Sequence, residues 1–297
     1  MKRLVFLALL AGCSPAPEEP PARQDPVVVY AAFEDDGAIV EMFDRYKEET
    51  GVLVIVRRGP AERIVNDLIN NNISPPADIL LTRSVVDAWR AAEESALRPL
   101  YSEAVTERIP AWARDPDSLW FATAVDEAVF VYSGDEPSVH GPDELANDGF
   151  RGKLCLSSSE NAINRAVIAT LIDRTDLRSA EILVRGWVKN LALPPFATEE
   201  QLLAAVAEGR CELGLASRRA ASLSDVAIAE ADTLYTDVGA MGLARHARNP
   251  EGAAALVEWL ASDFEWHGDA PPVLENVGLV AWHYEDAVKL AERARYR

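Results

Sequence analysis

The chain has 297 residues, a hydrophobic content of 49% and a formal net charge of −19. This length suits two domains better than one, and the apolar content is sufficient for packed cores. Because nucleic-acid affinity depends on neutralising phosphates with basic side chains, this acidity excludes nucleic acid as a partner and argues against a basic membrane-binding face.

The N-terminus has the pattern of a secretory signal that ends in a cysteine. Lys2 and Arg3 precede an apolar run over residues 4–10, and a Leu-Ala-Gly-Cys tetrad ends at Cys13. These features are typical of an exported protein, and the cysteine directly after the cut resembles a bacterial lipoprotein signal, in which the thiol is lipidated. An ordinary signal that contains a cysteine is the alternative. We predict a signal peptide over residues 1–12, lipidation at Cys13, and a periplasmic or cell-surface protein held to the membrane by lipid only.

Residues 13–26 are rich in proline and charge and predict a stiff spacer. Strands and helices alternate after it, which favours an α/β fold with mostly parallel sheets and helices on both faces. The first strands are expected over residues 27–30, 52–56 and 78–81, and the first helices over residues 37–49, 61–71 and 85–96.

The second half of the chain follows the same logic. Thr198 and Gln201 have the spacing of a capping box at a helix start, and Pro250 has the place of a first-turn proline. Strands are expected over residues 129–132, 154–156 and 211–216, and helices over residues 161–174, 181–191, 198–209 and 249–262.

Two cysteines remain once Cys13 is assigned to lipid. Cys155 and Cys211 each lie in an apolar, strand-like run. In an oxidising compartment an even pair favours a disulfide, which would stabilise the fold by on the order of 4 kcal/mol. Two buried free thiols are the alternative.

Ligands of open α/β sheets bind outside the carboxyl ends of the strands. Several of the polar side chains found there also have an explanation that needs no ligand. Acids before a helix interact favourably with the helix dipole, serines act as N-caps, and an arginine pair can lie in a solvated loop. The candidate ligand-binding residues are Glu34 and Asp35 after the first strand, Arg83 after the third, Asp126 and Glu127 before the strand at 129–132, Ser158, Ser159 and Asn161 after the strand at 154–156, and Arg218 and Arg219 after the strand at 211–216.

The sequence contains none of the common catalytic motifs: no G-x-S-x-G, H-E-x-x-H, P-loop or Gly-rich dinucleotide turn. Its four histidines are scattered and show no metal-ligand spacing: His140, His246, His267 and His283. We therefore predict a protein that is not an enzyme and has no cofactor.

Several segments, in order, resemble the ferric-iron family of periplasmic solute-binding proteins, which serve ABC importers. The resemblance covers nearly all of the mature chain. It rests on Val29-Tyr30, Ser74 to Ile79, Glu107 to Pro110, Arg114 to Phe121, Phe130 to Tyr132, Gly152 to Ser159, and Gly209 to Glu212.

The resemblance implies a two-lobed periplasmic binding protein fold of type II, in which two strand crossovers form a hinge. It assigns residues 27–128 plus 237–277 to the N-lobe and residues 129–236 plus 278–297 to the C-lobe. It also implies a Cys155–Cys211 disulfide, an ABC permease in the inner membrane as partner, a small-molecule or ion ligand, and a monomer.

The iron ligands of that family do not carry over to this sequence. The family's first-loop histidine and tyrosine fall on Glu34 and Asp35, and an arginine used for the accompanying anion falls on Asp126. The remaining tyrosines fall on Ile163, Arg219 and Ala220. Fe³⁺ needs hard anionic oxygens of the kind that phenolates supply.

Three hypotheses for the ligand follow. The first is a zwitterion or an organic or phosphorylated anion, held between the N-lobe acids and the arginines and serines of the C-lobe. The second is ferric iron or an iron chelate bound through carboxylates. The third is a degenerate binding fold that acts as an interaction or sensory lipoprotein. The metal ligands of the second hypothesis would be Glu34, Asp35, Asp126 and Glu127.

Overall fold

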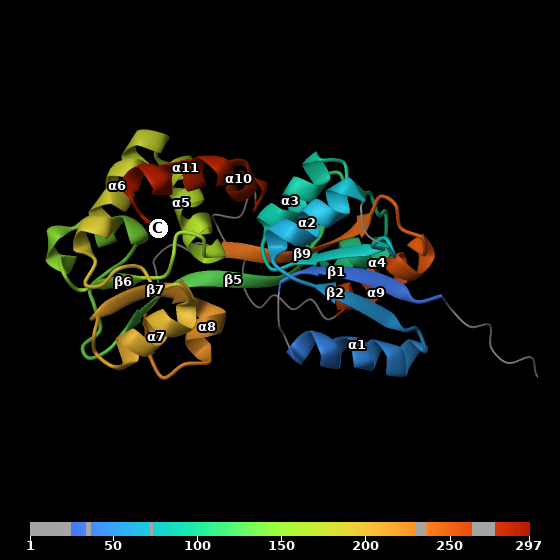
Figure 1. The fold of residues 1–297 in the computed structure, drawn as a ribbon, viewed down its shortest axis with the longest axis horizontal. Coiled ribbons are helices and arrows are strands. Elements are labelled where there is room, and N and C mark those ends of the chain that lie inside the picture. Colours follow the sequence, from blue (N-terminus) through green and yellow to red (C-terminus); the bar gives the residue numbers. More distant parts are fainter. Residues whose placement is uncertain (1–24, 34–36, 72–73, 230–235, 263–276) are drawn as a thin grey trace, which may run out of the picture.

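The computed structural model describes residues 25–33, 37–71, 74–229, 236–262 and 277–297. The predicted signal peptide, Cys13, most of the spacer, Glu34 and Asp35 therefore lie outside the described residues. Nine strands form one connected sheet in the order β2-β1-β3-β9-β5-β7-β6, with β4 paired to β9 and β8 paired to β5. Figure 1 shows two lobes side by side, joined by β5 and β9.

The N-lobe is built on three parallel strands that are covered on both faces. β1 runs between β2 and β3, and all six of its residues are buried, which is why it reads as a continuous apolar run. Helices α2 and α3 lie on one face and α1 and α9 on the other (Figure 1). The elements are β1 Val27–Ala32, α1 Gly37–Thr50, β2 Val54–Arg58, α2 Ala61–Asn70, β3 Ile79–Thr82, α3 Val85–Glu93, β4 Leu97–Arg98, α4 Glu103–Arg108, η1 Ala111–Ala113 and α9 Pro250–Ser262.

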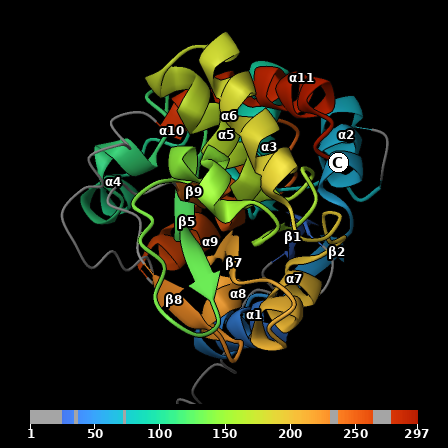
Figure 2. The ribbon, with the colours of Figure 1, turned by 90° about the vertical axis from the view of Figure 1, so that its left-hand side faces the viewer.

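The C-lobe has a smaller sheet with the same layering. Figure 2, viewed from this end, shows α5, α6 and α11 above the sheet and α7 and α8 below it. Helix α10 contacts α3 of the N-lobe and α5 of the C-lobe. The elements are η2 Pro142–Ala146, η3 Asp148–Phe150, β6 Leu154–Leu156, α5 Ala162–Arg174, α6 Leu177–Asn190, α7 Glu199–Ala207, β7 Leu213–Ser217, α8 Arg218–Ser222, β8 Ala227–Ala229, α10 Val277–Trp282 and α11 Tyr284–Ala294.

Two long strands connect the lobes: β5 (Phe121–Tyr132) and β9 (Thr236–Ala244). β5 pairs with β9 as far as Glu127 and with β7 from Ala128 onward, so it changes partner between these two residues. Gly239 lies at a close approach on β9, where a Cβ atom would come within 2.9 Å of Thr123 Oγ1 and 3.0 Å of the Thr82 carbonyl oxygen. A larger residue at position 239 would push the crossover strands apart.

The buried apolar side chains form separate cores in the two lobes. One core draws its residues from Val27–Ala122 and Val238–Ala281. Two further clusters draw theirs from Ala128–Ala229 and Ala287–Tyr296. The lobe boundaries expected from the sequence remain a prediction. Two residues pack on the other side of these boundaries: Ala128 in the second lobe and Ala281 in the first.

The α/β class is confirmed, but the expectation of a mostly parallel sheet needs correction. Within the described residues, three strand pairings are parallel and five are antiparallel, because β9 runs opposite to β3, β4 and β5, and β5 also runs opposite to β7 and β8. Helix α6 begins at Leu177 rather than 181, since the Asp176 carboxylate accepts hydrogen bonds from the Arg178 and Ser179 N–H groups. No helix in the described part of the chain is long and apolar enough to cross a bilayer.

The disulfide between Cys155 and Cys211 is present. Cys155 lies in β6 and Cys211 just before β7, and the two Cα atoms are 5.9 Å apart. β6 and β7 are parallel neighbours, so the bridge joins two adjacent strands of the C-lobe. Both cysteines are buried in a cluster with Leu202 and Val206 of α7.

Candidate functional site

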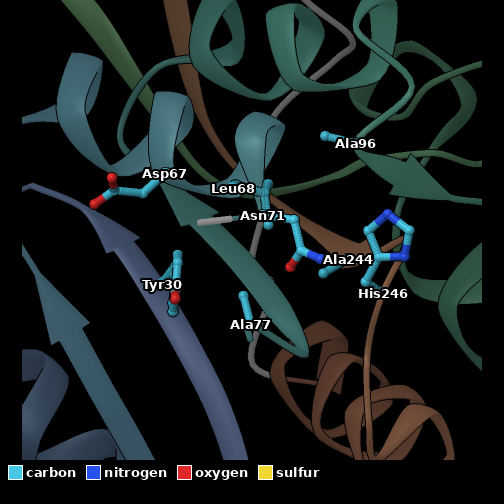
Figure 3. A pocket seen from close by; sticks show the side chains of 8 residues that line it. All are labelled: Tyr30, Asp67, Leu68, Asn71, Ala77, Ala96, Ala244 and His246. Carbon is cyan, nitrogen blue, oxygen red and sulfur yellow. The ribbon is translucent and has the colours of Figure 1, made fainter. Parts of the chain in front are cut away.

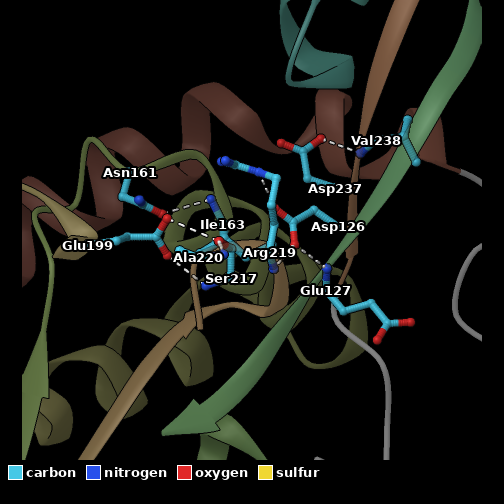
Figure 4. A network of polar contacts seen from close by, with 10 residues as sticks. All are labelled: Asp126, Glu127, Asn161, Ile163, Glu199, Ser217, Arg219, Ala220, Asp237 and Val238. Atoms are coloured by element: carbon cyan, nitrogen blue, oxygen red, sulfur yellow. Dashed lines mark hydrogen bonds and ion pairs between the residues drawn. The ribbon is translucent and has the colours of Figure 1, made fainter. Parts of the chain in front are cut away.

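The strand register brings two acids and two arginines together at the crossover. Glu127 is the last β5 residue before the pair Ala128–Ser217, and Arg218 directly follows Ser217. Arg218 Nε lies 2.7 Å from Glu127 Oε2. The neighbouring pair has Arg219 Nε 3.6 Å from Asp126 Oδ2, and the Arg219 N–H donates to Asp126 Oδ1 at 3.2 Å. Figure 4 shows Asp126 and Arg219 facing each other above the strand.

This arrangement corrects the expectation of an acidic wall opposite a basic wall. Asp126 and Glu127 extend the β5–β7 ladder, so they lie beside Arg218 and Arg219 instead of across a gap from them. The Arg219 side chain is 56% exposed and that of Arg218 is 38% exposed. Exposed ion pairs are weak, so the more exposed pair, Asp126 with Arg219, is the one able to exchange partners with a ligand.

The serine run before α5 has a different role from the expected one. The N-cap of α5 is Asn161, whose Oδ1 accepts from the N–H groups of Ile163 at 3.0 Å and Asn164 at 3.3 Å. Ser158 Oγ accepts from the Glu160 N–H instead. Since the Asn161 side chain already occupies the first-turn donors, this helix end is satisfied without an anion.

Ile163, Arg219 and Ala220, the residues on which the resemblance would place the family's tyrosines, are drawn together with Asp126 in Figure 4. Ile163 is buried at the start of α5, and the Ala220 N–H donates to Ser217 Oγ at 3.2 Å. The residues at these positions supply no phenolate oxygen.

Glu199 is a positioning residue that the sequence reading did not single out. Its carboxylate accepts from the Ser217 N–H at 2.6 Å and from Ser217 Oγ at 3.1 Å, which fixes the end of β7 just before the arginines. The predicted cap at Thr198 is present, with its hydroxyl accepting from the Gln201 N–H at 3.4 Å. The sequence signal that could have pointed to Glu199 was its place directly after the predicted helix cap, Thr198.

A cavity of about 430 Å³ opens between the carboxyl ends of β1 and β3, the crossover strands and Arg219 of the C-lobe. The Arg83 guanidinium lies over the Phe33 ring, 4.8 Å from its centroid. Arg83, Asp126 and Arg219 line the cavity, while Glu127, Arg218, Ser158, Ser159 and Asn161 are not among its lining residues. Its apolar lining consists of Phe33, Ile39, Met42, Leu81, Ala124, Val125 and Leu260.

A second cavity is too small for a solute. It measures about 10 Å³ and lies near the amino end of β3 among Tyr30, Ala77 and His246 (Figure 3). That volume holds roughly one water molecule.

A buried carboxyl group, Asp237, and a half-buried one, Asp87, lie beside the crossover, and neither was foreseen from the sequence. Asp237 in β9 is 3% exposed, and its Oδ1 accepts from the Val85 and Val238 N–H groups at 3.0 and 2.8 Å. Burial raises the pKa of Asp237 to about 7. Burial also raises the pKa of Asp87 in α3 to about 6, against the opposing effect of Arg90 and Arg165.

The described residues contain no group of three or more histidine, cysteine, aspartate or glutamate side chains arranged to hold a metal ion. Asp126 and Glu127, two of the four acids in the metal hypothesis, are each engaged by an arginine. The other two, Glu34 and Asp35, lie outside the described residues.

Residues 27–264 match the family model of bacterial extracellular solute-binding proteins, and the chain belongs to this family. It is therefore a solute-binding protein of the kind that serves ABC importers, a non-enzymatic transport component. The chain is 26% identical over 283 residues to "Iron uptake protein A1" of Synechocystis, an alignment that covers 86% of this chain and 77% of that protein.

Solved structures share the fold across nearly the whole chain. The IdiA (FutA) protein of Trichodesmium, in complex with iron and citrate ligands, superposes with a TM-score of 0.79 at 24% identity, covering 92% of this chain and 100% of that one. The ferric binding protein of Campylobacter jejuni also gives 0.79, at 18% identity, with coverages of 91% and 100%. The resemblance to the ferric-iron family is thus confirmed, and the type II fold with it.

Proposed function

We propose that this protein captures a small zwitterion or organic anion, phosphorylated anions included, in the cleft between its lobes and delivers it to an ABC permease. The observation that carries the proposal is the pairing of Asp126 with Arg219 in the lining of the cavity between the lobes. A ligand with an acid and a cation could replace this internal ion pair by two ion pairs of its own. Arginine suits this role because its planar fork binds carboxylate or phosphate through two hydrogen bonds.

If the acid group of the ligand binds Arg219, removing this side chain should weaken solute binding. Arg219→Ala should weaken binding of the anionic solute by roughly 10- to 100-fold, since a hydrogen bond to a charged group contributes about 1.5–3 kcal/mol. The measurement is isothermal titration with the solute that most raises Tm in a panel of amino acids, dicarboxylates, phosphonates, polyamines and ferric citrate. Arg185→Ala is the matched control, because Arg185 pairs with Glu181 on the surface of α6. Equal effects of both substitutions would contradict the proposed role.

A second candidate is ferric iron or an iron chelate, bound by carboxylates. It is favoured by the relatives, whose names refer to iron uptake and whose fold neighbour holds iron and citrate. In that case only ferric citrate or Fe³⁺ raises Tm, and Asp126→Ala abolishes the effect. If no solute in the panel changes Tm, the third hypothesis, an interaction or sensory lipoprotein, is the one that stands.

We further propose that Cys13 carries the lipid and that residues 13–26 hold the folded lobes away from the membrane. The net charge of −19 argues against direct attachment through a basic face. Cys13→Ser should move the protein from the membrane fraction to the soluble fraction and prevent incorporation of labelled palmitate. Unchanged membrane association would show that another element anchors the chain.

A further inference from the structure

We infer that the solute carries an apolar body, which fills the cavity beside the crossover while its charged end meets Arg219 and Asp126. The inference rests on the proposed function and narrows it from small ions in general to solutes with a hydrocarbon or aromatic part. The cavity, of about 430 Å³, falls within the range of 300–1,000 Å³ that is common for small-molecule sites.

The wall of the cavity is apolar from several directions. Ile39 and Met42 come from α1, Leu260 from the end of α9, and Leu81 and Val125 from the sheet. Ile39, Leu81 and Leu260 also belong to the N-lobe core, with exposures of 5–7%, so the cavity is a shallow opening into that core. Removing such a surface from water is favourable when an apolar group of the ligand covers it.

Thr82, a polar residue on the N-lobe side of the cavity, already has hydrogen-bond partners for its side chain. Thr82 Oγ1 lies 2.8 Å from the Ser84 carbonyl oxygen and accepts from the Ala240 N–H at 3.2 Å. A ligand therefore need not supply polar groups there. The charged side chains among the described lining residues are confined to Arg83, Asp126 and Arg219. This distribution separates an apolar interior from a charged rim.

A bare ferric ion fits this cavity poorly. Fe³⁺ is a hard cation that needs several anionic oxygens, whereas Asp126 is the one carboxylate among the described lining residues and is engaged by Arg219. An amino acid with a large apolar side chain, or a carboxylate with an apolar tail, matches both the rim and the interior.

A homologous series tests the inference directly. Isothermal titration is run on the whole mature protein with 2-aminoalkanoates from alanine to 2-aminooctanoate, and with straight-chain carboxylates of the same lengths. Each added methylene that enters the cavity should lower Kd by about fourfold, until the cavity is full and the series levels off.

A matched pair of α1 variants locates the effect. Met42→Gln places an amide in the apolar wall and should reduce the gain per methylene to below about twofold. Val40→Gln, on the same helix but 46% exposed and away from the cavity, should leave the series unchanged. Tight binding of short zwitterions without dependence on chain length would overturn this inference and leave the proposed function intact. If no organic solute binds and ferric citrate does, both fall.

Discussion

Replacing both Cys155 and Cys211 by alanine should lower the free energy of unfolding by about 4 kcal/mol. The bridge closes a loop with a sequence separation of 56 residues. In the entropic model, closing a loop of this length lowers the conformational entropy of the unfolded chain and so stabilises the folded protein by about 4 kcal/mol. In a chain of this size the loss corresponds to a fall in Tm of roughly 8–16 °C. The two cysteines are buried, so alanine avoids placing a hydroxyl in the cluster of the C-lobe.

The measurement is chemical denaturation followed by tryptophan fluorescence, since Trp187 in α6 is buried in the same lobe. Full reduction of the unmodified protein serves as an independent control and should reproduce the double substitution. Because the bridge joins β6 to the segment before β7, which leads to Arg218 and Arg219, weakened solute binding should accompany the loss. A double variant as stable as the parent would mean that packing alone sets the stability of this lobe.

Local patterns predict much of the fold, because the first three strands and helices of the N-lobe follow one another in the sequence. β1 is an uninterrupted apolar run, and its expected start at Val27 is confirmed. The strand β9 was missed for a physical reason. Gly239 and Gly242 interrupt its apolar pattern, and both are required by close neighbours, such as the Leu119 carbonyl oxygen 2.7 Å from a Cβ placed at 242. Contacts between distant segments cannot be read from local periodicity.

At the candidate site too, local sequence predicted individual residues but not the contacts between segments that are distant in the sequence. The sequence placed charged residues at strand ends, and three of them, Arg83, Asp126 and Arg219, line the cavity. It assigned Asp126 to one wall and Arg219 to the other because it began the strand at Val129 and left Asp126 and Glu127 before it, whereas β5 already begins at Phe121. The register of one continuous strand, which passes from β9 to β7, instead places the acids beside the arginines. The apolar wall of the cavity was not predicted, because its residues have the sequence pattern of ordinary core residues.

Asp237→Asn should stabilise the protein at pH 8 and have much less effect at pH 4. The folded protein raises the pKa of Asp237 from 3.8 to about 7 through burial. A raised pKa means that the protonated carboxyl is the form that folding favours. Its contribution is complete below pH 4 and is lost as the pH rises through about 7. The loss amounts to on the order of 4 kcal/mol, and asparagine, which does not ionise, avoids it.

The geometry makes asparagine a close substitute. Both N–H groups that bind Asp237, from Val85 and Val238, donate to the same oxygen, which an amide retains. Asp87 titrates within the same range and raises the pKa of Asp237 further, so part of the pH dependence remains in the variant. Asp44→Asn, on the exposed face of α1, is the control for replacing a surface carboxylate by an amide.

The measurement is Tm from pH 4 to pH 8 for the parent and both variants. The difference between Asp237→Asn and the parent should grow with pH and level off above about pH 7. A constant difference would mean that Asp237 is ionised throughout and held by its hydrogen bonds. The result also bears on transport, because Asp237 lies on β9, where the lobes are joined, and is the register partner of Asp126. If its ionisation weakens the crossover, the balance between open and closed lobes changes near neutral pH, and solute affinity should change over the same range as Tm.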